Sequence, residues 1–300
     1  MAEIVLTDGG MGQEVIARSA APPTNLWSGR VLAEEPHVVE AAHRDFIEAG
    51  ARAIIVCSYS VTPERLSRDP AMADRFEELQ NAALDIAAAV QATAPHDVAV
   101  LGYLPPLVGS YHPEKAPPRE AMREHYARIV ALQAPRVDVL LAETMSAVFE
   151  IEITTEAMRA ADKPFWVAIS VDDRDGTTMR SGEPLADGVA AARQGGAGAI
   201  LLNCSRPEAC TDGLPIVAEA GLPFGAYANG FAHAAELEPG QTVADMAVRD
   251  DLGPDAYAAH VMEWVERGAT IVGGCCEVGP AHVAEIEKRL RAAGHEVVAP

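Results

Sequence analysis

The apolar residues of the chain fall into short runs separated by longer amphipathic stretches. Eight short runs are rich in valine, isoleucine, leucine and alanine, and glycine, proline or polar turn residues stand near their ends. These runs cover residues 4–7, 53–57, 98–103, 137–142, 165–171, 199–203, 224–228 and 270–273. Apolar runs of this length without polar alternation are typical of strands buried on both faces of a parallel sheet. The pattern therefore predicts eight parallel strands.

Stretches with helical periodicity lie between the predicted strands, for example at 37–49, 75–94 and 119–133. Glycine is expected just past a helix end and before the next strand, and it stands there at Gly50, Gly196, Gly221 and Gly268. Eight strand and helix units predict an α/β fold, a (β/α)8 barrel made by residues 1–300 as one domain. An open doubly wound sheet is the alternative, but no glycine-rich phosphate loop follows a predicted strand. Residues 105–118 and 236–254 are expected to be barrel loops.

Composition and charge exclude several classes of function. The 300 residues suffice for one such barrel, which needs about 250. With 44 acidic and 23 basic residues the formal net charge is −21, which excludes a nucleic-acid binder and argues against anionic membrane surfaces. No apolar run reaches the roughly 18 residues of a membrane span and no signal-peptide pattern is present, so we expect a cytoplasmic protein. Five cysteines in a long chain favour reduced thiols or a metal over a secreted disulfide framework.

Three cysteines follow predicted strands at the end of the barrel where such enzymes carry their chemistry. Cys204 follows the sixth strand, and Cys275 and Cys276 follow the eighth. Only one strand separates the sixth from the eighth, so Cys204 can approach the adjacent pair. Three thiolates form a tetrahedral zinc site with one open position, which is the arrangement of a catalytic zinc.

Other interpretations of the cysteines remain open. Cys275 and Cys276 could form a vicinal disulfide or be two buried small residues, although neither explains Cys204. Cys57 also ends a predicted strand and could supply a fourth sulfur when no substrate is bound. Cys210 lies in an apparent helix and is expected in the core.

The expected metal centre suits a thiol substrate. Zinc with three thiolates is already electron-rich, so it activates water poorly, but it holds a substrate sulfur as a nucleophilic thiolate at neutral pH. The expected reaction is attack of that sulfur on an electrophilic carbon. No HxH follows the first strand and no carboxylate follows the seventh, which argues against metal-hydrolase and two-carboxylate glycosidase chemistry.

Four motifs carry a resemblance to a known family. They are Asp-Gly-Gly-Met-Gly at 8–12, Glu143-Thr144, Asn203-Cys204 and Gly-Gly-Cys-Cys at 273–276. In this order they resemble the homocysteine S-methyltransferase family, over essentially the whole chain. The resemblance implies that Cys204, Cys275 and Cys276 bind zinc, that the homocysteine sulfur takes the fourth position, and that direct methyl transfer gives methionine.

The resemblance also assigns roles around an amino-acid substrate. Asp8 and Glu143 are placed to hold the α-ammonium group, and the backbone N–H groups of Gly9 and Gly10 are expected to reach the α-carboxylate. A structural alternative exists for each carboxylate: Asp8 as the N-cap of the helix expected after it, and Glu143 as one half of an internal ion pair.

Three further polar residues are weaker candidates. Ser58 occupies a position where the family often has a hydroxyl residue, so it is expected to contact substrate. Asn203 and Asn229 are expected to orient loops or thiolates, and Asn229 is also a candidate for substrate contact. The segments 57–61 and 143–146 depart from the commoner family patterns. Homocysteine remains the expected acceptor, with selenohomocysteine or another small thiol as alternatives.

The methyl donor must carry a good leaving group, so it is a sulfonium or a quaternary ammonium cation. Aromatic faces attract such cations, and six aromatic residues lie near strand ends: Trp27, Tyr59, Tyr103, Tyr111, Tyr227 and Phe231. Betaine-using members carry a C-terminal arm that is not seen before Pro300, so S-methylmethionine or S-adenosylmethionine is expected, with betaine or dimethylsulfoniopropionate as alternatives. Cobalamin and folate are not expected. A zinc store without turnover and a dithiol redox protein are the other classes considered, and the oligomeric state stays open.

Overall fold

The computed structural model describes residues 1–234, 237, 241 and 246–300. The eight predicted strands are present and run parallel in the order β2, β3, β4, β5, β6, β7, β8, β1. Their bounds are Glu3–Leu6 for β1, Ala53–Ile55 for β2, Ala99–Leu104 for β3, Val139–Met145 for β4, Phe165–Ile169 for β5, Ala199–Asn203 for β6, Phe224–Tyr227 for β7 and Ile271–Val272 for β8. The predicted α/β barrel is confirmed, and part of the loop expected at 236–254 lies outside the described residues.

The barrel closes between β1 and β2 through backbone contacts just past the end of β1. Thr7 forms a parallel bridge with Ala53. The Arg52 N–H donates to the Leu6 carbonyl at 2.7 Å. The Asp8 N–H donates to the Ala53 carbonyl at 3.0 Å, which fixes the first residue of the glycine-rich motif against β2.

A ninth strand, β9 (Glu296–Val298), is not predicted by the sequence pattern. It pairs in parallel with β1, where Ile4 lies opposite Val297. The Arg52 side chain adds a hydrogen bond from Nε to the Val297 carbonyl at 3.2 Å. β9 therefore covers the edge of β1 that β2 reaches only at Thr7.

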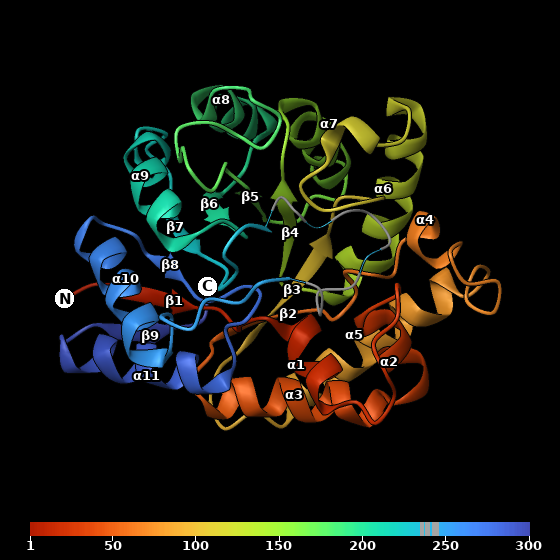
Figure 1. The fold of residues 1–300 in the computed structure, drawn as a ribbon, viewed down its shortest axis with the longest axis horizontal. Coiled ribbons are helices and arrows are strands. Elements are labelled where there is room, and N and C mark those ends of the chain that lie inside the picture. The colour runs from red at the N-terminus through yellow and green to blue at the C-terminus, as the bar shows by residue number, and fades with distance from the viewer. Residues whose placement is uncertain (235–236, 238–240, 242–245) are drawn as a thin grey trace.

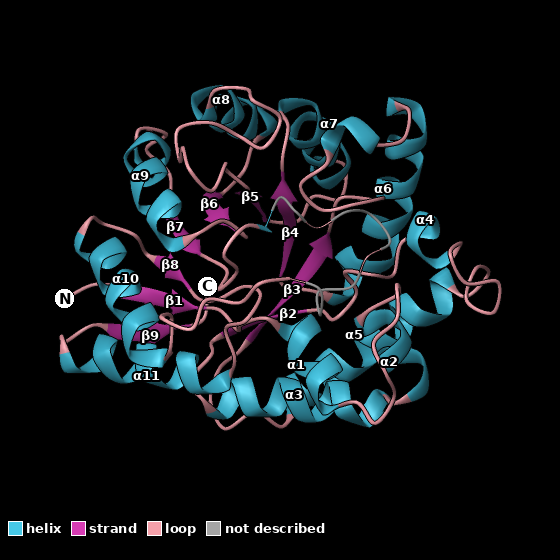
Figure 2. Cartoon of the chain, in the orientation of Figure 1, coloured by secondary structure: helices cyan, strands magenta, loops and turns pink. Residues whose placement is uncertain are grey.

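Helices surround the strands on the outside of the barrel (Figures 1 and 2). They are α1 (Met11–Arg18), α2 (Ser28–Glu34), α3 (Pro36–Glu48), α4 (Pro63–Leu66), α5 (Phe76–Ala92), α6 (Arg119–Gln133), α7 (Val148–Arg159), α8 (Leu185–Gly195), α9 (Pro207–Ala218), α10 (Pro254–Glu266) and α11 (Pro280–Ala292). Gly50 and Gly196 follow α3 and α8 with φ of +112° and +93°, a conformation that favours glycine, as predicted. No helix among the described residues is long and apolar enough to cross a membrane.

Buried side chains form two layers of core. One layer lies between strands and helices and includes Ile54 and Phe46, and the other fills the barrel and includes Leu101 and Leu201. Side chains that point inward from parallel strands stack in layers in such barrels. Cys204 belongs to the inner cluster, so the candidate site sits on top of the packed barrel interior.

Candidate metal and substrate site

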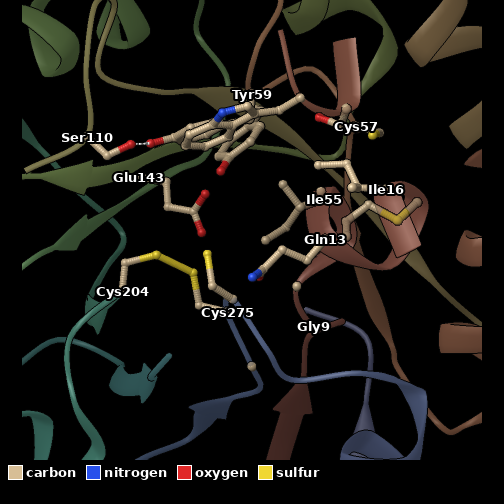
Figure 3. Close-up of a pocket in the computed structure, with 18 of the residues that line it drawn as sticks. Gly9, Gln13, Ile16, Ile55, Cys57, Tyr59, Ser110, Glu143, Cys204 and Cys275 are labelled. Atoms are coloured by element: carbon tan, nitrogen blue, oxygen red, sulfur yellow. Dashed lines mark hydrogen bonds between the residues drawn. A yellow bond between two sulfur atoms is a disulfide. The ribbon is translucent and has the colours of Figure 1, made fainter. Parts of the chain in front are cut away.

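The three predicted zinc ligands come together where β6 and β8 end. The sulfur atoms of Cys204, Cys275 and Cys276 all lie within 4.8 Å of one another. In the described part of the chain, no other group of histidine, cysteine or carboxylate side chains meets this criterion. Cys204 and Cys275 are joined as a disulfide (Figure 3). Their Cα atoms lie 5.8 Å apart, and Cys276 is free. The vicinal disulfide considered from the sequence is therefore wrong, and three thiolate ligands are available only in the reduced protein.

The glycines of the first motif allow two loops to pack closely beneath the cysteines. A Cβ atom at Gly10 would lie 2.6 Å from the Cys275 carbonyl oxygen, and one at Gly9 would collide with the Val278 carbonyl oxygen. The Gly10 N–H donates to that same Val278 oxygen at 2.8 Å. The expectation that Gly10 offers a free N–H to a substrate carboxylate is therefore wrong. The Gly9 N–H has no partner among the described residues.

The Asp8 side chain is fully buried, and only one of its two carboxylate oxygens has a hydrogen-bond partner among the described residues. Its Oδ2 accepts the Ile55 N–H at 2.9 Å, and its Oδ1 has no hydrogen-bond partner among the described residues. Burial raises the pKa of Asp8 well above its ordinary value, and the nearby charge of Glu143 raises it further. The N-cap of α1 is Gly10, with no side-chain cap, so the alternative of Asp8 as a helix cap is wrong.

Glu143 lies near the end of β4 and is 3% exposed. Burial raises its pKa to about 7, although polar contacts with Tyr103, Tyr227 and Asn203 act in the opposite direction. Among the described residues no cation pairs with Glu143, so the ion-pair alternative is wrong within that part of the chain. Figure 3 shows its carboxylate directed toward the joined cysteines. Two neighbouring buried carboxylates without a cation form a pocket suited to a positively charged group.

A cavity of about 750 Å³ opens above these residues. Among predicted site residues, its wall includes Gly9, Gly10, Glu143 and the three cysteines, while Asp8 lies just behind Gly9 and Ile55. No lysine, arginine or histidine lines the cavity in the part of the chain that the structure describes. The described side chains that line the cavity are therefore neutral or acidic.

Ser58 and Asn229 do not reach the cavity wall. Ser58 Oγ is fully buried and accepts a hydrogen bond from Gln133 Nε2 at 3.4 Å. Asn229 Oδ1 accepts the Phe231 N–H at 3.1 Å, which shapes the turn after β7. Neither side chain is therefore placed for the predicted substrate contact. Asn203 orients the Glu143 segment as expected, because its Oδ1 accepts the Thr144 N–H at 3.1 Å.

Four of the six candidate aromatic residues line the cavity: Trp27, Tyr59, Tyr103 and Tyr111. The Trp27 and Tyr59 rings stack with centroids 5.8 Å apart, and the Tyr103 centroid lies 5.4 Å from that of Tyr59. The Tyr59 hydroxyl hydrogen-bonds to Ser110 (Figure 3). Tyr227 and Phe231 are buried and are not part of the lining.

The remaining cysteines stay outside the metal group. Cys57 lines the cavity, but its sulfur is not among those within 4.8 Å of one another, and Figure 3 shows it well apart from Cys204 and Cys275. Burial raises its pKa to about 12, so it is a neutral thiol. Cys210 is fully buried in α9, which confirms its place in the core.

The sequence pattern misses one polar residue of the site, Gln13. It lies in the first turn of α1, lines the cavity, hydrogen-bonds to the Glu277 carboxylate and accepts the Glu277 N–H at 2.8 Å. The Gly12 N–H at the same helix end has no partner among the described residues. The signal available in the sequence was a polar side chain directly after the glycine motif.

Comparisons with known proteins agree with this geometry. The family model of homocysteine S-methyltransferase matches residues 5–290. Homocysteine S-methyltransferase of Escherichia coli is 29% identical and the alignment covers 96% of this chain and 95% of the relative. Selenocysteine Se-methyltransferase of Brassica oleracea is 26% identical, with 95% and 89% covered. The crystal structure of the homocysteine methyltransferase MmuM from Escherichia coli in its metallated form matches with a TM-score of 0.78 and 26% identity over 96% of both chains. Its oxidized form matches with a TM-score of 0.77 and 27% identity over 95% of this chain and 96% of that one.

Proposed function

This chain belongs to the homocysteine S-methyltransferase family, and we propose that it uses zinc to move a methyl group from a sulfonium donor to homocysteine, giving methionine. One observation carries the proposal. A cluster of three cysteine sulfurs faces a buried carboxylate pair that has no cation among the described residues. This arrangement offers one place for a metal-bound thiol and one for the ammonium group of the same amino acid.

The cysteine cluster fits zinc by the chemistry of its donors. Thiolates are soft ligands, and three of them without a fourth protein ligand are typical of a zinc site that keeps a position open. Cys204, Cys275 and Cys276 would hold the metal after reduction of the bond between Cys204 and Cys275. When bound, zinc supplies a Lewis acid that keeps a substrate sulfur in its nucleophilic thiolate form at neutral pH.

Asp8 and Glu143 would bind the α-ammonium of the acceptor. A cation between them stabilises the ionised form of both carboxylates, which offsets the burial that raises their pKa values. The unpartnered Asp8 Oδ1 supplies a hydrogen-bond acceptor for that ammonium. The two residues thereby fix the amino acid and leave its sulfur to point toward the cysteines.

The α-carboxylate would bind to neutral donors at the start of α1. The N–H groups of Gly9 and Gly12 have no partner among the described residues, and the Gln13 side chain lies on the same wall. The N-terminus of a helix favours an anion, and among the residues that line the described cavity no cationic side chain is present that would repel a cationic donor.

The aromatic wall would receive the cationic methyl donor. Trp27 and Tyr59 stack on each other and line a cavity that has no cationic lining among the described residues. Arg65, which is not part of that lining, already places its guanidinium 4.5 Å from the Tyr59 ring centroid, as expected for an aromatic group that attracts cations. S-methylmethionine and S-adenosylmethionine are the donors that we propose. The similarity to a selenocysteine Se-methyltransferase keeps a selenol acceptor as the second candidate.

The direct test is methionine formation by reduced, zinc-loaded protein. Homocysteine is offered with S-methylmethionine, S-adenosylmethionine, betaine or dimethylsulfoniopropionate, one donor at a time at equal concentration. We expect the highest rate with S-methylmethionine. A betaine rate that equals or exceeds it would overturn the proposed donor class, and no methionine from any donor with zinc bound would overturn the reaction.

A further inference from the structure

We propose that Arg180 is a positioning residue that fixes the backbone of the ligand cysteine Cys204 and so sets the affinity of the site for metal. The inference rests on the metal site of the proposed function. It concerns an arginine with a buried side chain that none of the sequence motifs includes, in the loop between β5 and α8.

Cys204 has an unfavourable backbone conformation that its surroundings must maintain. Its φ is +47°, in the left-handed region that residues other than glycine rarely adopt. Its own N–H makes only a long contact of 3.4 Å with the Tyr227 carbonyl. The stronger contact is at its carbonyl oxygen, which accepts a hydrogen bond from Arg180 Nη2 at 3.1 Å.

Arg180 is itself fixed in place. Its side chain is 2% exposed, and its two terminal nitrogens each donate to one oxygen of Asp173 at 2.9 Å. Its Nε donates to Ser170 Oγ at 3.1 Å, and that hydroxyl also lies 3.4 Å from the Cys204 carbonyl. The planar guanidinium thus reaches an anion, a hydroxyl and the ligand backbone at once, which a lysine ammonium cannot do with the same geometry.

Asp173 extends this anchor to the neighbouring loops. Its side chain is 5% exposed, and its oxygens also accept the N–H groups of Arg206 at 3.1 Å and Ala234 at 2.9 Å. Arg206 follows β6 and Ala234 follows β7. The ion pair of Asp173 and Arg180 therefore connects the loops after β5, β6 and β7 by hydrogen bonds next to Cys204.

A second residue of the cavity wall depends on the same guanidinium. Arg180 Cζ lies 4.9 Å from the centroid of the Tyr111 ring, and Tyr111 has a φ of +67°. Of the three described cavity-lining residues other than glycine with positive φ, Trp27, Tyr111 and Cys204, the last two both contact this arginine. A buried ion pair contributes little net stability compared with well-packed apolar residues, so this placement points to a role in orientation.

The test measures metal affinity rather than turnover. Reduced, metal-free wild type, Arg180→Met and Arg180→Lys are titrated with Co²⁺, with the thiolate charge-transfer absorbance as the signal, and affinities are obtained by competition with a chelator. Thermal unfolding of each metal-free protein reports whether it is folded. Arg249→Met is the control, because Arg249 likewise forms ion pairs, with Glu208 in the first turn of α9 and with Asp251, but does not contact a ligand cysteine.

We expect folded Arg180→Met to bind Co²⁺ about 10- to 100-fold more weakly than wild type, as is typical when a residue that orients a metal ligand is lost. The Co²⁺ affinity of Arg180→Lys should lie between those of wild type and Arg180→Met, and that of Arg249→Met should equal that of wild type. Folded Arg180→Met with wild-type affinity and spectrum would overturn the proposal. If Arg180→Met does not fold, wild-type affinity in Arg180→Lys would overturn it, and a reduced affinity there supports it. A wild-type chain that binds no Co²⁺ would instead overturn the metal site itself, and this inference with it.

Discussion

Replacing Glu143 by glutamine tests two effects of its charge: the stability lost by burying the charge, and the affinity that the charge contributes to amino-acid binding. Glutamine keeps the shape of glutamate but carries no charge. Burial raises the pKa of Glu143 from 4.5 to about 7, so folding takes up a proton between these pH values. The free energy of unfolding of the wild type therefore falls as the pH rises through this window. The difference between 4.5 and about 7 corresponds to about 3 kcal/mol of lost stability above pH 7.

The variant should gain stability and lose affinity. Metal-free Glu143→Gln should be more stable than wild type above pH 7 by up to about 3 kcal/mol, and equally stable below pH 4.5. Its loss of a charged hydrogen bond to the ammonium, about 1.5–3 kcal/mol, should weaken amino-acid binding about 10- to 150-fold. Wild-type affinity should rise with pH through about 7, and the variant should lack that rise.

The assay combines denaturant unfolding with calorimetric titration of methionine across pH, because methionine carries the ammonium but no titrating thiol. Glu150→Gln is the control. Burial also raises the pKa of Glu150 to about 7, but its carboxylate accepts the Ser146 N–H at 2.8 Å and lies outside the cavity lining. Glu150→Gln should change the free energy of unfolding about as much as Glu143→Gln does, and should bind methionine with wild-type affinity. The reasoning is refuted if Glu143→Gln binds methionine as tightly as wild type, or is less stable above pH 7.

Three further variants probe other parts of the site. Cys275→Ala leaves two thiolates, so it should lose both bound zinc, measured by elemental analysis, and methyl transfer; an active, zinc-free variant would contradict the metal assignment. Cys57→Ser should retain one zinc per chain, because the Cys57 sulfur lies outside the cluster; a lower stoichiometry would make Cys57 a ligand. Trp27→Leu should raise the KM for the donor about 2- to 30-fold, the range of a cation–π contact, and leave the homocysteine KM unchanged; equal changes in both would argue against an aromatic donor site.

The barrel could be predicted because each buried strand is an apolar run that ends in turn residues. The ninth strand could not, because Glu296–Val298 has only three residues and depends on an edge of β1 that closure of the barrel leaves open. A strand of that length has no periodicity to detect.

The cysteine cluster could be predicted because strand order alone brings the ends of β6 and β8 near each other. Side-chain direction after a strand could not be predicted in the same way. Cys57 and Tyr59 line the cavity, whereas the Ser58 side chain between them is buried against Gln133. Because side chains alternate along an extended segment, a shift of the segment by one residue would bring Ser58 to the cavity and bury its two neighbours. The proposed orienting role of Arg180 could not be predicted from the sequence either, because it depends on contacts between loops that are far apart in the chain.

The central claim is that this chain methylates the sulfur of homocysteine at the three-cysteine site. Its most direct test follows isotopically labelled homocysteine by mass spectrometry in a reaction with S-methylmethionine and reduced, zinc-loaded protein. We predict that the label appears in methionine, and that none appears when Cys275→Ala replaces the wild type. Recovery of the labelled homocysteine unchanged, with zinc bound to the wild-type protein, would contradict the account.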